Sequence, residues 1–415
     1  MYTLFMQGKN KVLLRNLKKE IEKLIRGSQS ALIFGPRQVG KTTLIKEALL
    51  NAPNVREYPL QNPEIRAEIE KDPAILSRQL LANKNKPYVF VDEAQKVPEI
   101  FDGIQYILDE KKAKFLITGS SARKLRRKGS NLLPGRVKIF HLDPLLWNEF
   151  GWIKENNIKE LEIKNINKKV DYFFEKSLIF GALPGIVNLN NDNDRKDFLK
   201  AYAHIYLEEE IRAEALSRKI GAFSRFLELS ANESGTSPNF TKLSMESGVS
   251  MPAIREFYNL LEDTLIVERI DPYLKNARKR ILASSRYYFF DLGVRNSLAR
   301  FSLNKELINS QKGILFEHAI ILEIIRRIRS LNKEFKVCYW RTSGGAEVDC
   351  VIDLGHKVIP VEIKASKKIA LSELKGLKIF LDDYKDVADI GYVITWGDKP
   401  EQLADNIIAL PWSFI

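Results

Sequence analysis

The chain has 415 residues, more than one hydrophobic core usually organises, so we expect about two to four domains. Its hydrophobic share of 45% and charged share of 29% exclude a disordered chain and are typical of a globular protein. The formal net charge of +13 makes phosphate-bearing partners plausible without identifying one.

Cysteine use and the first residues predict where the protein works. Cys338 and Cys350 are the only cysteines and lack metal-ligand spacing, so we expect neither a disulfide framework nor a zinc ribbon. The N-terminal residues do not show the pattern of a secretory signal, and no apolar stretch is long enough to span a bilayer. We therefore expect a cytoplasmic protein without a membrane partner.

The first segment with clear chemistry binds phosphate. It reads ALIFGPRQVGKTTLIKEAL, an apolar strand followed by G-x-x-x-x-G-K-T-T and an amphipathic helix. Gly35 and Gly40 let the loop amides curl around a phosphate at the helix N-terminus. Lys41 reaches the β- and γ-phosphates, and Thr42 offers a hydroxyl to magnesium, with Thr43 beside it. ATP and Mg²⁺ are the expected ligands.

Two later strands complete this predicted site. The first reads KPYVFVDEAQKV and ends in adjacent carboxylates, of which Asp92 holds the magnesium and Glu93 polarises the attacking water. The second reads AKFLITGSS, and a small polar side chain at its end senses the γ-phosphate. Thr118 and Ser120 are both candidates for this sensor.

A basic loop follows, with the sequence ARKLRRKGSNLLPGRVKIFHLDPL. Arg136 lies just before the next strand and is the candidate for an arginine that stabilises transition-state charge, in its own subunit or in a neighbouring one. The earlier basic residues either bind nucleic acid or form a solvated loop: Arg123, Lys124, Arg126, Arg127 and Lys128.

These blocks, in this order, resemble a prokaryotic group of AAA-type P-loop ATPases whose C-terminal half is a domain of unknown function. The motifs that carry the resemblance run through nearly the whole chain: GPRQVGKTT, VFVDEAQ, LITGSS, LPGR, GALPG, YFFDLGVRN and EVDCVIDLGHKVIPVEIK. The resemblance implies a sheet with the strand of Asp92 and Glu93 at its centre, and an ATPase that can work as a homo-oligomer.

The middle of the chain changes from helical repeats to a mixed pattern. Residues from Trp147 to about Ser230 carry apolar side chains at helix spacing and predict the helical lid of an AAA core. A short helix ending near Gly248, a second helix capped by Ser250, and two strands then predict a winged helix. This module either binds DNA or holds another domain, and its candidate DNA contacts are Arg255, Lys275, Arg278, Lys279 and Arg280.

The last segment predicts a second cluster of charged side chains. A helix carries Glu317 near its start, one strand carries Asp349, and the strand VIPVEIK carries Glu362 and Lys364. Side chains two apart on a strand share a face, so Glu362 and Lys364 form either a salt bridge at a sheet edge or half of a metal site. Carboxylate oxygens suit Mg²⁺ or Mn²⁺, which would be held by Glu317, Asp349 and Glu362.

This constellation resembles the PD-(D/E)XK restriction-endonuclease-like fold. Asp349, Glu362 and Lys364 fall at the motif positions and Glu317 supplies the helix acid, while Val348 replaces the leading proline. The resemblance implies a metal-dependent nuclease in which Glu362 and Lys364 are catalytic. The alternative is an ion-pair cluster inherited from a nuclease that no longer cuts.

Taken together, the sequence predicts an α/β protein: a P-loop parallel sheet with a helical lid, a winged helix and a nuclease-like domain. The predicted domains are residues 1–146, 147–235, 236–300 and 301–415. The expected function is ATP-dependent binding and Mg²⁺-dependent cutting of DNA, with branched or repair-related structures as one hypothetical substrate. One alternative is a nucleotide-dependent switch that binds nucleic acid or a protein through an inactive nuclease-like domain. A transcription regulator is a third possibility that the acidic residues of the second helix disfavour.

Overall fold

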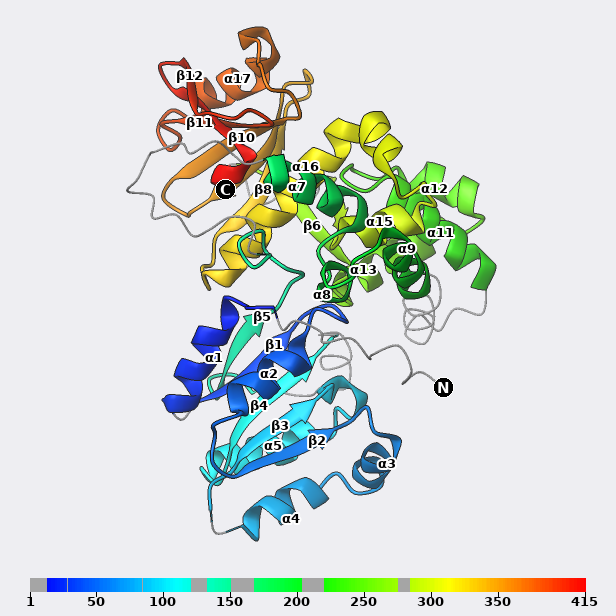
Figure 1. Ribbon diagram of the computed structural model, residues 1–415, viewed down its shortest axis with the longest axis vertical. Coiled ribbons are helices and arrows are strands. Elements are labelled where there is room, and N and C mark those ends of the chain that lie inside the picture. The colour runs from blue at the N-terminus through cyan, green and yellow to red at the C-terminus, as the bar shows by residue number, and fades with distance from the viewer. Residues whose placement is uncertain are drawn as a thin grey trace. The chain divides into compact units, whose positions relative to one another are not determined.

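The computed structural model describes residues 13–27, 29–83, 85–120, 133–150, 168–203, 220–274 and 284–415. The chain forms two compact units (Figure 1). Unit 1 comprises Met1–Leu145, Leu183–Asn188 and Asp263–Leu265, and unit 2 comprises Leu146–Ala182, Leu189–Glu262 and Ile266–Ile415. Within the described ranges, no helix combines the length and the apolar character that crossing a bilayer requires.

Unit 1 alternates strands and helices. Its strands are β1 (Ser30–Phe34), β2 (Val55–Pro59), β3 (Tyr88–Asp92), β4 (Lys114–Gly119) and β5 (Val137–His141). Its helices are α1 (Leu17–Arg26), α2 (Lys41–Leu49), α3 (Pro63–Lys71), α4 (Ile75–Leu81), α5 (Ile100–Asp109), the short α8 (Pro184–Val187) and the 3₁₀ turn η1 (Ala94–Lys96).

The five strands of unit 1 form one parallel sheet in the order β2-β3-β4-β1-β5. All strands therefore end at the same edge of the sheet, and ligands of such sheets bind at the carboxyl edge. Asp92 is the last residue of β3, as the sequence predicted. The expectation that β3 is central is wrong, because β4 occupies the middle and β3 lies between β2 and β4.

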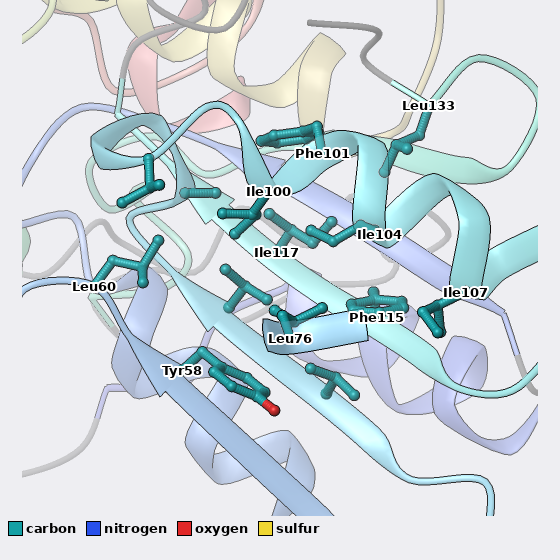
Figure 2. Packing of buried hydrophobic residues seen from close by; sticks show 14 of the residues in the cluster. Tyr58, Leu60, Leu76, Ile100, Phe101, Ile104, Ile107, Phe115, Ile117 and Leu133 are labelled. Atoms are coloured by element: carbon teal, nitrogen blue, oxygen red, sulfur yellow. The ribbon is translucent and has the colours of Figure 1, made fainter. Parts of the chain in front are cut away.

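One core of unit 1 fills the space between the sheet and helices α3, α4 and α5 (Figure 2). Alternate residues of a strand share a face, and Phe115 and Ile117 of β4 accordingly point together into this core. From α5, Ile100, Ile104 and Ile107 reach it at helical spacing. Burying each such side chain stabilises the fold by roughly 1.5–3 kcal/mol, so this core fixes the sheet whose edge carries the predicted ATP site.

Unit 2 contains the remaining helices and a second sheet. Its helices are α7 (Lys168–Phe180), α9 (Asp192–Lys200), α11 (Ile220–Asn232), α12 (Phe240–Ser247), α13 (Met251–Asp263), α15 (Leu292–Leu298), α16 (Lys305–Ser330) and α17 (Lys375–Asp383), with the 3₁₀ turns η3 (Leu371–Leu374) and η4 (Trp412–Phe414). Its strands are β6 (Val267–Pro272), β7 (Arg286–Phe289), β8 (Lys336–Arg341), β9 (Glu347–Asp353), β10 (Val358–Lys364), β11 (Gly391–Thr395), β12 (Glu401–Ala404) and β13 (Ile407–Pro411).

The strands of unit 2 form a mixed sheet of eight in the order β12-β13-β11-β10-β9-β8-β6-β7. Strands β8, β9 and β10 are antiparallel neighbours, whereas β10, β11 and β13 run parallel. Helix α17 packs against β9 and β10 through a core that includes Leu377 and Phe380 (Figure 1). The two sheets and their helices confirm the α/β class that the sequence predicted.

The predicted boundary at residue 300 crosses a continuous sheet. Helices α12 and α13 and the antiparallel pair β6–β7 form as the sequence predicted, and Gly248 ends α12 with a φ of 72°. Strand β6, however, also pairs in parallel with β8, through Asp271–Cys338 and Pro272–Tyr339. The predicted wing strands are therefore part of the same sheet as the predicted nuclease-like domain.

An aromatic cluster joins the beginning of unit 2 to its end. Phe174 of α7 stacks on Trp412 at 3.8 Å between ring centroids, and Trp147 meets both rings edge-on. Trp396 and Phe316 extend the cluster. The region predicted as an ATPase lid thus shares an aromatic core with the C-terminal segment. The division into residues 147–235 and 301–415 remains a prediction from the sequence, and this core spans both segments.

Two motifs of the sequence meet in unit 2. The amide of Ala182, in the GALPG motif, donates to Asp291 Oδ2 at 2.7 Å, and Asp291 also caps α15 in the YFFDLGVRN motif. Gly293 lies so close to α7 that an added Cβ would come within 2.1 Å of the Phe180 carbonyl oxygen. Both motifs therefore hold α7 and α15 together.

Candidate functional site

The P-loop of unit 1 has the backbone that its glycines allow. Gly40 has a φ of 93° and immediately precedes α2, a conformation that favours glycine. Gly35 follows β1, and a Cβ there would lie 2.1 Å from the carbonyl oxygen of Leu142. The loop thus delivers its amides to the N-terminus of α2, where an anion is stabilised.

Lys41 and Thr42 occupy the positions that the motif requires. The Lys41 ammonium is buried and donates to the carbonyl oxygens of Gly35 and Pro36, at 2.9 and 3.0 Å. The Thr42 hydroxyl lies 3.0 and 2.9 Å from the two carboxylate oxygens of Asp92. These two side chains fit the magnesium site predicted for them, since a hydroxyl and a carboxylate converge. Thr43 is exposed on α2.

Glu93 is held in an uncommon backbone conformation directly after β3. Its φ of 58° and ψ of 48° are left-handed, which costs a non-glycine residue of order 1 kcal/mol or more. The side chain is buried, and its Oε1 lies 3.7 Å from the Lys41 ammonium. Such strain persists where surrounding contacts fix it, and it clusters at functional sites.

The charge of Glu93 is set by its neighbours. Burial raises the pKa of the carboxyl, but the positive charges of Lys41 and Arg37 lower it. Hydrogen bonds from Gln95 and Ser120 lower it further, so the pKa ends below its ordinary value. The carboxylate therefore stays ionised at neutral pH and can accept a hydrogen bond from water.

The predicted sensor residues contact the two acids rather than each other. The Thr118 hydroxyl donates to Asp92 Oδ1 at 2.6 Å and accepts from the Glu93 amide at 3.0 Å. The Ser120 hydroxyl donates to Glu93 Oε2 at 3.2 Å. Both candidates therefore line the site.

Gln95 is a site residue that the sequence reasoning missed. Its Nε2 donates to Glu93 Oε2 and to Ser120 Oγ, the latter at 2.8 Å, and its side chain is buried. Its Oε1 accepts from the Ser120 amide at 3.3 Å. The one signal in the sequence was its place two residues after Glu93, within VFVDEAQ.

The position of Arg136 bears on the two predicted alternatives, action in its own subunit or in a neighbouring one. It precedes β5 at the amino end of the strand, where Val137 pairs with Ser30 at the start of β1, whereas the P-loop follows the other end of β1. Its guanidinium pairs with Asp109 at 2.6 Å near the surface. Arg136 therefore lies at the opposite edge of the sheet from Lys41, and contact with the ATP of its own subunit is not supported.

Glu362 and Lys364 of unit 2 form a direct ion pair. The Lys364 ammonium lies 2.7 Å from Glu362 Oε1, as expected for two side chains on one face of β10. Glu362 is buried and its Oε2 has no hydrogen-bond partner. Such an atom is costly unless something else binds it.

Asp349 lies where strands β9 and β10 separate. Their ladder runs as far as the pair Val361–Cys350, and beyond it Asp349 Oδ2 accepts from the amide of Ile363 at 2.8 Å. The side chain thereby takes over a hydrogen bond that the backbone would otherwise make. Asp349 is placed next to the strand segment that carries Glu362 and Lys364.

Glu317 approaches Asp349 from α16. This helix begins at Lys305 and bends at Gln311. Glu317 therefore lies well inside the helix, whereas the sequence analysis placed it near the helix start. The Tyr288 hydroxyl donates to Glu317 Oε1 at 2.8 Å, and Arg286 lies 3.8 Å from the same oxygen. His318 instead donates from Nε2 to the Phe289 carbonyl oxygen, 2.8 Å away.

The acids of unit 2 raise one another's pKa. Burial is the largest cause of the raised pKa of Glu317 and of Glu362, and the charge of Asp349 raises both further. Burial raises the pKa of Asp349 as well, and Glu347 adds to the effect at all three carboxyls. Glu347, which the sequence analysis did not single out, therefore belongs to this acidic cluster.

The acidic cluster fits a divalent cation in chemistry but is not arranged around one. Its donors are carboxylate oxygens, one of them buried without a partner, which is the set that Mg²⁺ or Mn²⁺ prefers. Across the described residues, however, no three histidine, cysteine, aspartate or glutamate side chains are placed to hold a metal ion together.

The predicted DNA contacts are only partly described. Arg255 is exposed on α13 and stacks over Phe240, with 5.5 Å from the guanidinium carbon to the ring centroid. Glu256, also exposed, follows it. The other predicted contacts, and the basic run before Arg136, lie outside the described residues: Lys275, Arg278, Lys279, Arg280, Arg123, Lys124, Arg126, Arg127 and Lys128.

Comparisons with known proteins identify three segments. Residues 27–151 match the model of an AAA domain, residues 172–305 a domain of unknown function (DUF8612), and residues 312–415 another domain of unknown function (DUF4143). The parallel sheet, the P-loop and its paired acids, with this match, define an AAA-type P-loop ATPase domain. Two domains of unknown function follow it in the chain.

Two relatives that match nearly the whole chain are themselves described as uncharacterized proteins. An uncharacterized protein of Mycobacterium tuberculosis, Rv2008c, is 24% identical over 96% of this chain and 83% of its own. An uncharacterized protein of Methanocaldococcus jannaschii, MJ1544, is 24% identical over 96% of this chain and 91% of its own. Among solved structures, the Walker-type ATPase PABY2304 of Pyrococcus abyssi aligns with a TM-score of 0.47 at 14% identity, covering 70% of this chain and 97% of that one.

Proposed function

We propose that this chain hydrolyses ATP in unit 1 and cuts a nucleic-acid phosphodiester in unit 2. For the ATPase step, the observation that carries the proposal is the convergence of Thr42 and Asp92 beside a buried Glu93. Lys41 would bind the β- and γ-phosphates, and Thr42 and Asp92 would hold Mg²⁺. Glu93 would orient the attacking water, with Ser120 or Thr118 near the γ-phosphate.

For the cutting step, the carrying observation is the cluster of Asp349, Glu362 and Lys364 at the point where β9 and β10 separate. A divalent cation bound there would polarise the phosphate and lower the pKa of a bound water. Asp349, Glu362 and Glu317 would hold this cation. Lys364 would neutralise charge that develops on the phosphate oxygens.

The proposed substrate is DNA, held through phosphates without much choice of sequence. Arg255 and the basic residues Lys275, Arg278, Lys279 and Arg280 would bind the backbone, as cationic side chains do. Glu256 beside Arg255 on the exposed side of α13 disfavours close reading of bases by this helix. Branched or repair-related DNA is the structural class we would test first.

A cleavage assay with two variants tests this proposal. Linear, single-stranded, nicked and branched DNA and RNA are incubated with the full chain and Mg²⁺ or Mn²⁺, with and without ATP. Glu362→Ala should abolish cutting and leave ATP hydrolysis intact, whereas Lys41→Ala should abolish ATP hydrolysis. Cutting that survives Glu362→Ala would show that the nuclease site is not at Glu362, and no cutting by the wild type under any condition would show that unit 2 is not a nuclease.

One observation favours a second candidate function. Lys364 already neutralises Glu362, and the described residues place no three ligands around a cation. A nucleotide-dependent switch that binds nucleic acid or a protein, with unit 2 as its docking surface, would need no cation there. ATP-controlled binding of the same nucleic acids in a separate binding assay, without metal-dependent cutting in the cleavage assay, would support this candidate over the nuclease.

A further inference from the structure

Strand β7 sends two neighbouring same-face side chains toward the acidic cluster. Arg286 and Tyr288 are two residues apart, so they share a face of the strand, and they are 7% and 1% exposed. The Tyr288 hydroxyl donates to Glu317 Oε1 at 2.8 Å, and Arg286 Nη1 lies 3.8 Å from the same oxygen. One carboxylate oxygen of Glu317 thus interacts with both side chains.

Arg286 also connects two elements that carry acids. Its Nη2 donates to Glu347 Oε1 on β9, while Nη1 faces Glu317 on α16. The guanidinium carbon of Arg286 also lies over the ring of Tyr339, 4.4 Å from the ring centroid. A planar guanidinium can bridge two carboxylates in this way, whereas an ammonium is a single point of charge.

We propose that Tyr288 and Arg286 are positioning residues of the cation site in unit 2, which fix the carboxylate of Glu317, one of the proposed ligands of that site. This inference rests on the proposed function of that site. Carboxylates that bind metals are commonly oriented by such hydrogen bonds, and losing one typically weakens metal binding by about 10- to 100-fold. Strand β7 then contributes side chains to the cation site in addition to pairing with β6.

Tyr288→Phe is the variant that separates orientation from packing. It removes one hydroxyl and leaves the ring that packs edge-on against His318, 5.1 Å between centroids. The matched control is Tyr287→Phe, because Tyr287 is the adjacent residue on the opposite face of β7, where its ring packs against Tyr258. Both variants lose one phenolic oxygen from the same strand.

The measurement is Mn²⁺ binding to the full chain without nucleotide, followed by electron paramagnetic resonance of the free ion. The binding that Glu362→Ala removes is assigned to unit 2. Tyr288→Phe should weaken that binding about 10- to 100-fold, and Tyr287→Phe should leave it unchanged. Equal Mn²⁺ affinity in wild type and Tyr288→Phe would overturn the role of Tyr288 while leaving the proposed function standing.

Two further outcomes are decisive. If Glu362→Ala removes no Mn²⁺ binding, the cation site of the proposed function fails, and the positioning roles fail with it. Arg286→Lys keeps the positive charge but cannot span Glu317 and Glu347, so it should weaken Mn²⁺ binding as well. Unchanged affinity in Arg286→Lys would overturn the role of Arg286, and a lowered thermal midpoint with unchanged affinity would show that either residue is only structural.

Discussion

Gln95 holds the side chain of Glu93, the acid proposed to orient water in the ATP site. Its amide nitrogen donates to Glu93 Oε2 and to Ser120 Oγ, and all three side chains are buried. The left-handed turn at Glu93 brings a side chain two residues later back toward the carboxylate. Because a positive φ at a glutamate is not encoded in the local pattern, the sequence could predict the acids but not this contact.

We predict that Gln95→Ala lowers kcat for ATP hydrolysis about tenfold or more, since assistance by a well-placed base is worth roughly 10²–10⁴. ATP affinity should change little, because Lys41 and the loop amides are untouched. Steady-state kinetics and nucleotide titration measure the two quantities. Gln61→Ala, on an exposed residue of the same unit, is the control, and a raised Kd with unchanged kcat would contradict the role.

The buried carboxyl of Asp291 predicts how the stability of the protein depends on pH. Burial raises its pKa above 3.8, although Arg326 and the amides of Ala182, Gly293 and Val294 oppose the shift. A carboxyl whose pKa is higher in the folded state stabilises the fold most below its unfolded pKa. That contribution is lost as pH rises through the folded pKa.

We therefore predict that wild type exceeds Asp291→Asn in free energy of unfolding by more at pH 4 than at pH 7. Asparagine does not titrate, so the difference between the two proteins isolates Asp291 from other groups. Urea unfolding of both proteins across this range measures it. A difference that grows toward pH 7 would show that the folded-state pKa is lowered instead.

Two helical glycines differ in what surrounds them. In α15, a Cβ on Gly293 would lie 2.1 Å from the carbonyl oxygen of Phe180, whereas in α16 a Cβ on Gly313 would meet nothing within 4 Å. Alanine is the better helix former by about 0.5–1 kcal/mol. The same substitution should therefore have opposite effects at the two positions.

We predict that Gly313→Ala stabilises unit 2 by about 0.5–1 kcal/mol. Gly293→Ala should destabilise it by roughly 1–3 kcal/mol or more, because backbone must move to admit the methyl group. Chemical unfolding followed by tryptophan fluorescence measures both, since Trp147, Trp396 and Trp412 lie in the core of this unit. Destabilisation by both variants would mean that α16 needs its glycine for another reason.

Elements were predictable where their signals are local. The P-loop, the acids that end β3 and the pair α12–α13 follow from spacing within about 20 residues, and each lies where the sequence placed it. The pairing of β6 with β8, at Asp271–Cys338 and Pro272–Tyr339, joins segments far apart in the chain. No periodicity in either segment specifies such a partner, so the predicted boundary at residue 300 missed it.

At the scale of the whole molecule, the position of Arg136 suggests a test of whether the ATPase works as a homo-oligomer. It lies at the sheet edge opposite its own P-loop and pairs with Asp109 at the surface, where an ion pair contributes little to stability. If Arg136 takes part in ATP hydrolysis, an arginine so placed would act in the active site of another copy. Its substitution should leave each chain folded.

We predict that Arg136→Ala and Lys41→Ala are each inactive as ATPases and that mixing the two restores measurable hydrolysis. In the mixture, an intact P-loop from one chain can meet an intact Arg136 from another, and such an arginine is worth about 10³–10⁵ in kcat. Steady-state ATPase assays of the single and mixed proteins decide the matter. Full activity of Arg136→Ala alone, or a mixture that stays inactive, would exclude this arrangement.

The aromatic cluster of unit 2 has a consequence for the order in which the protein folds during its synthesis. The five strands of the ATPase sheet are complete once His141 has been added, so that sheet can form while later residues are still being translated. The rings of Trp147 and Phe174 can pack against Trp412 only after Trp412 has been synthesised. Nascent chains therefore expose these rings through most of translation, which makes them the expected binding site of a chaperone on the unfinished protein.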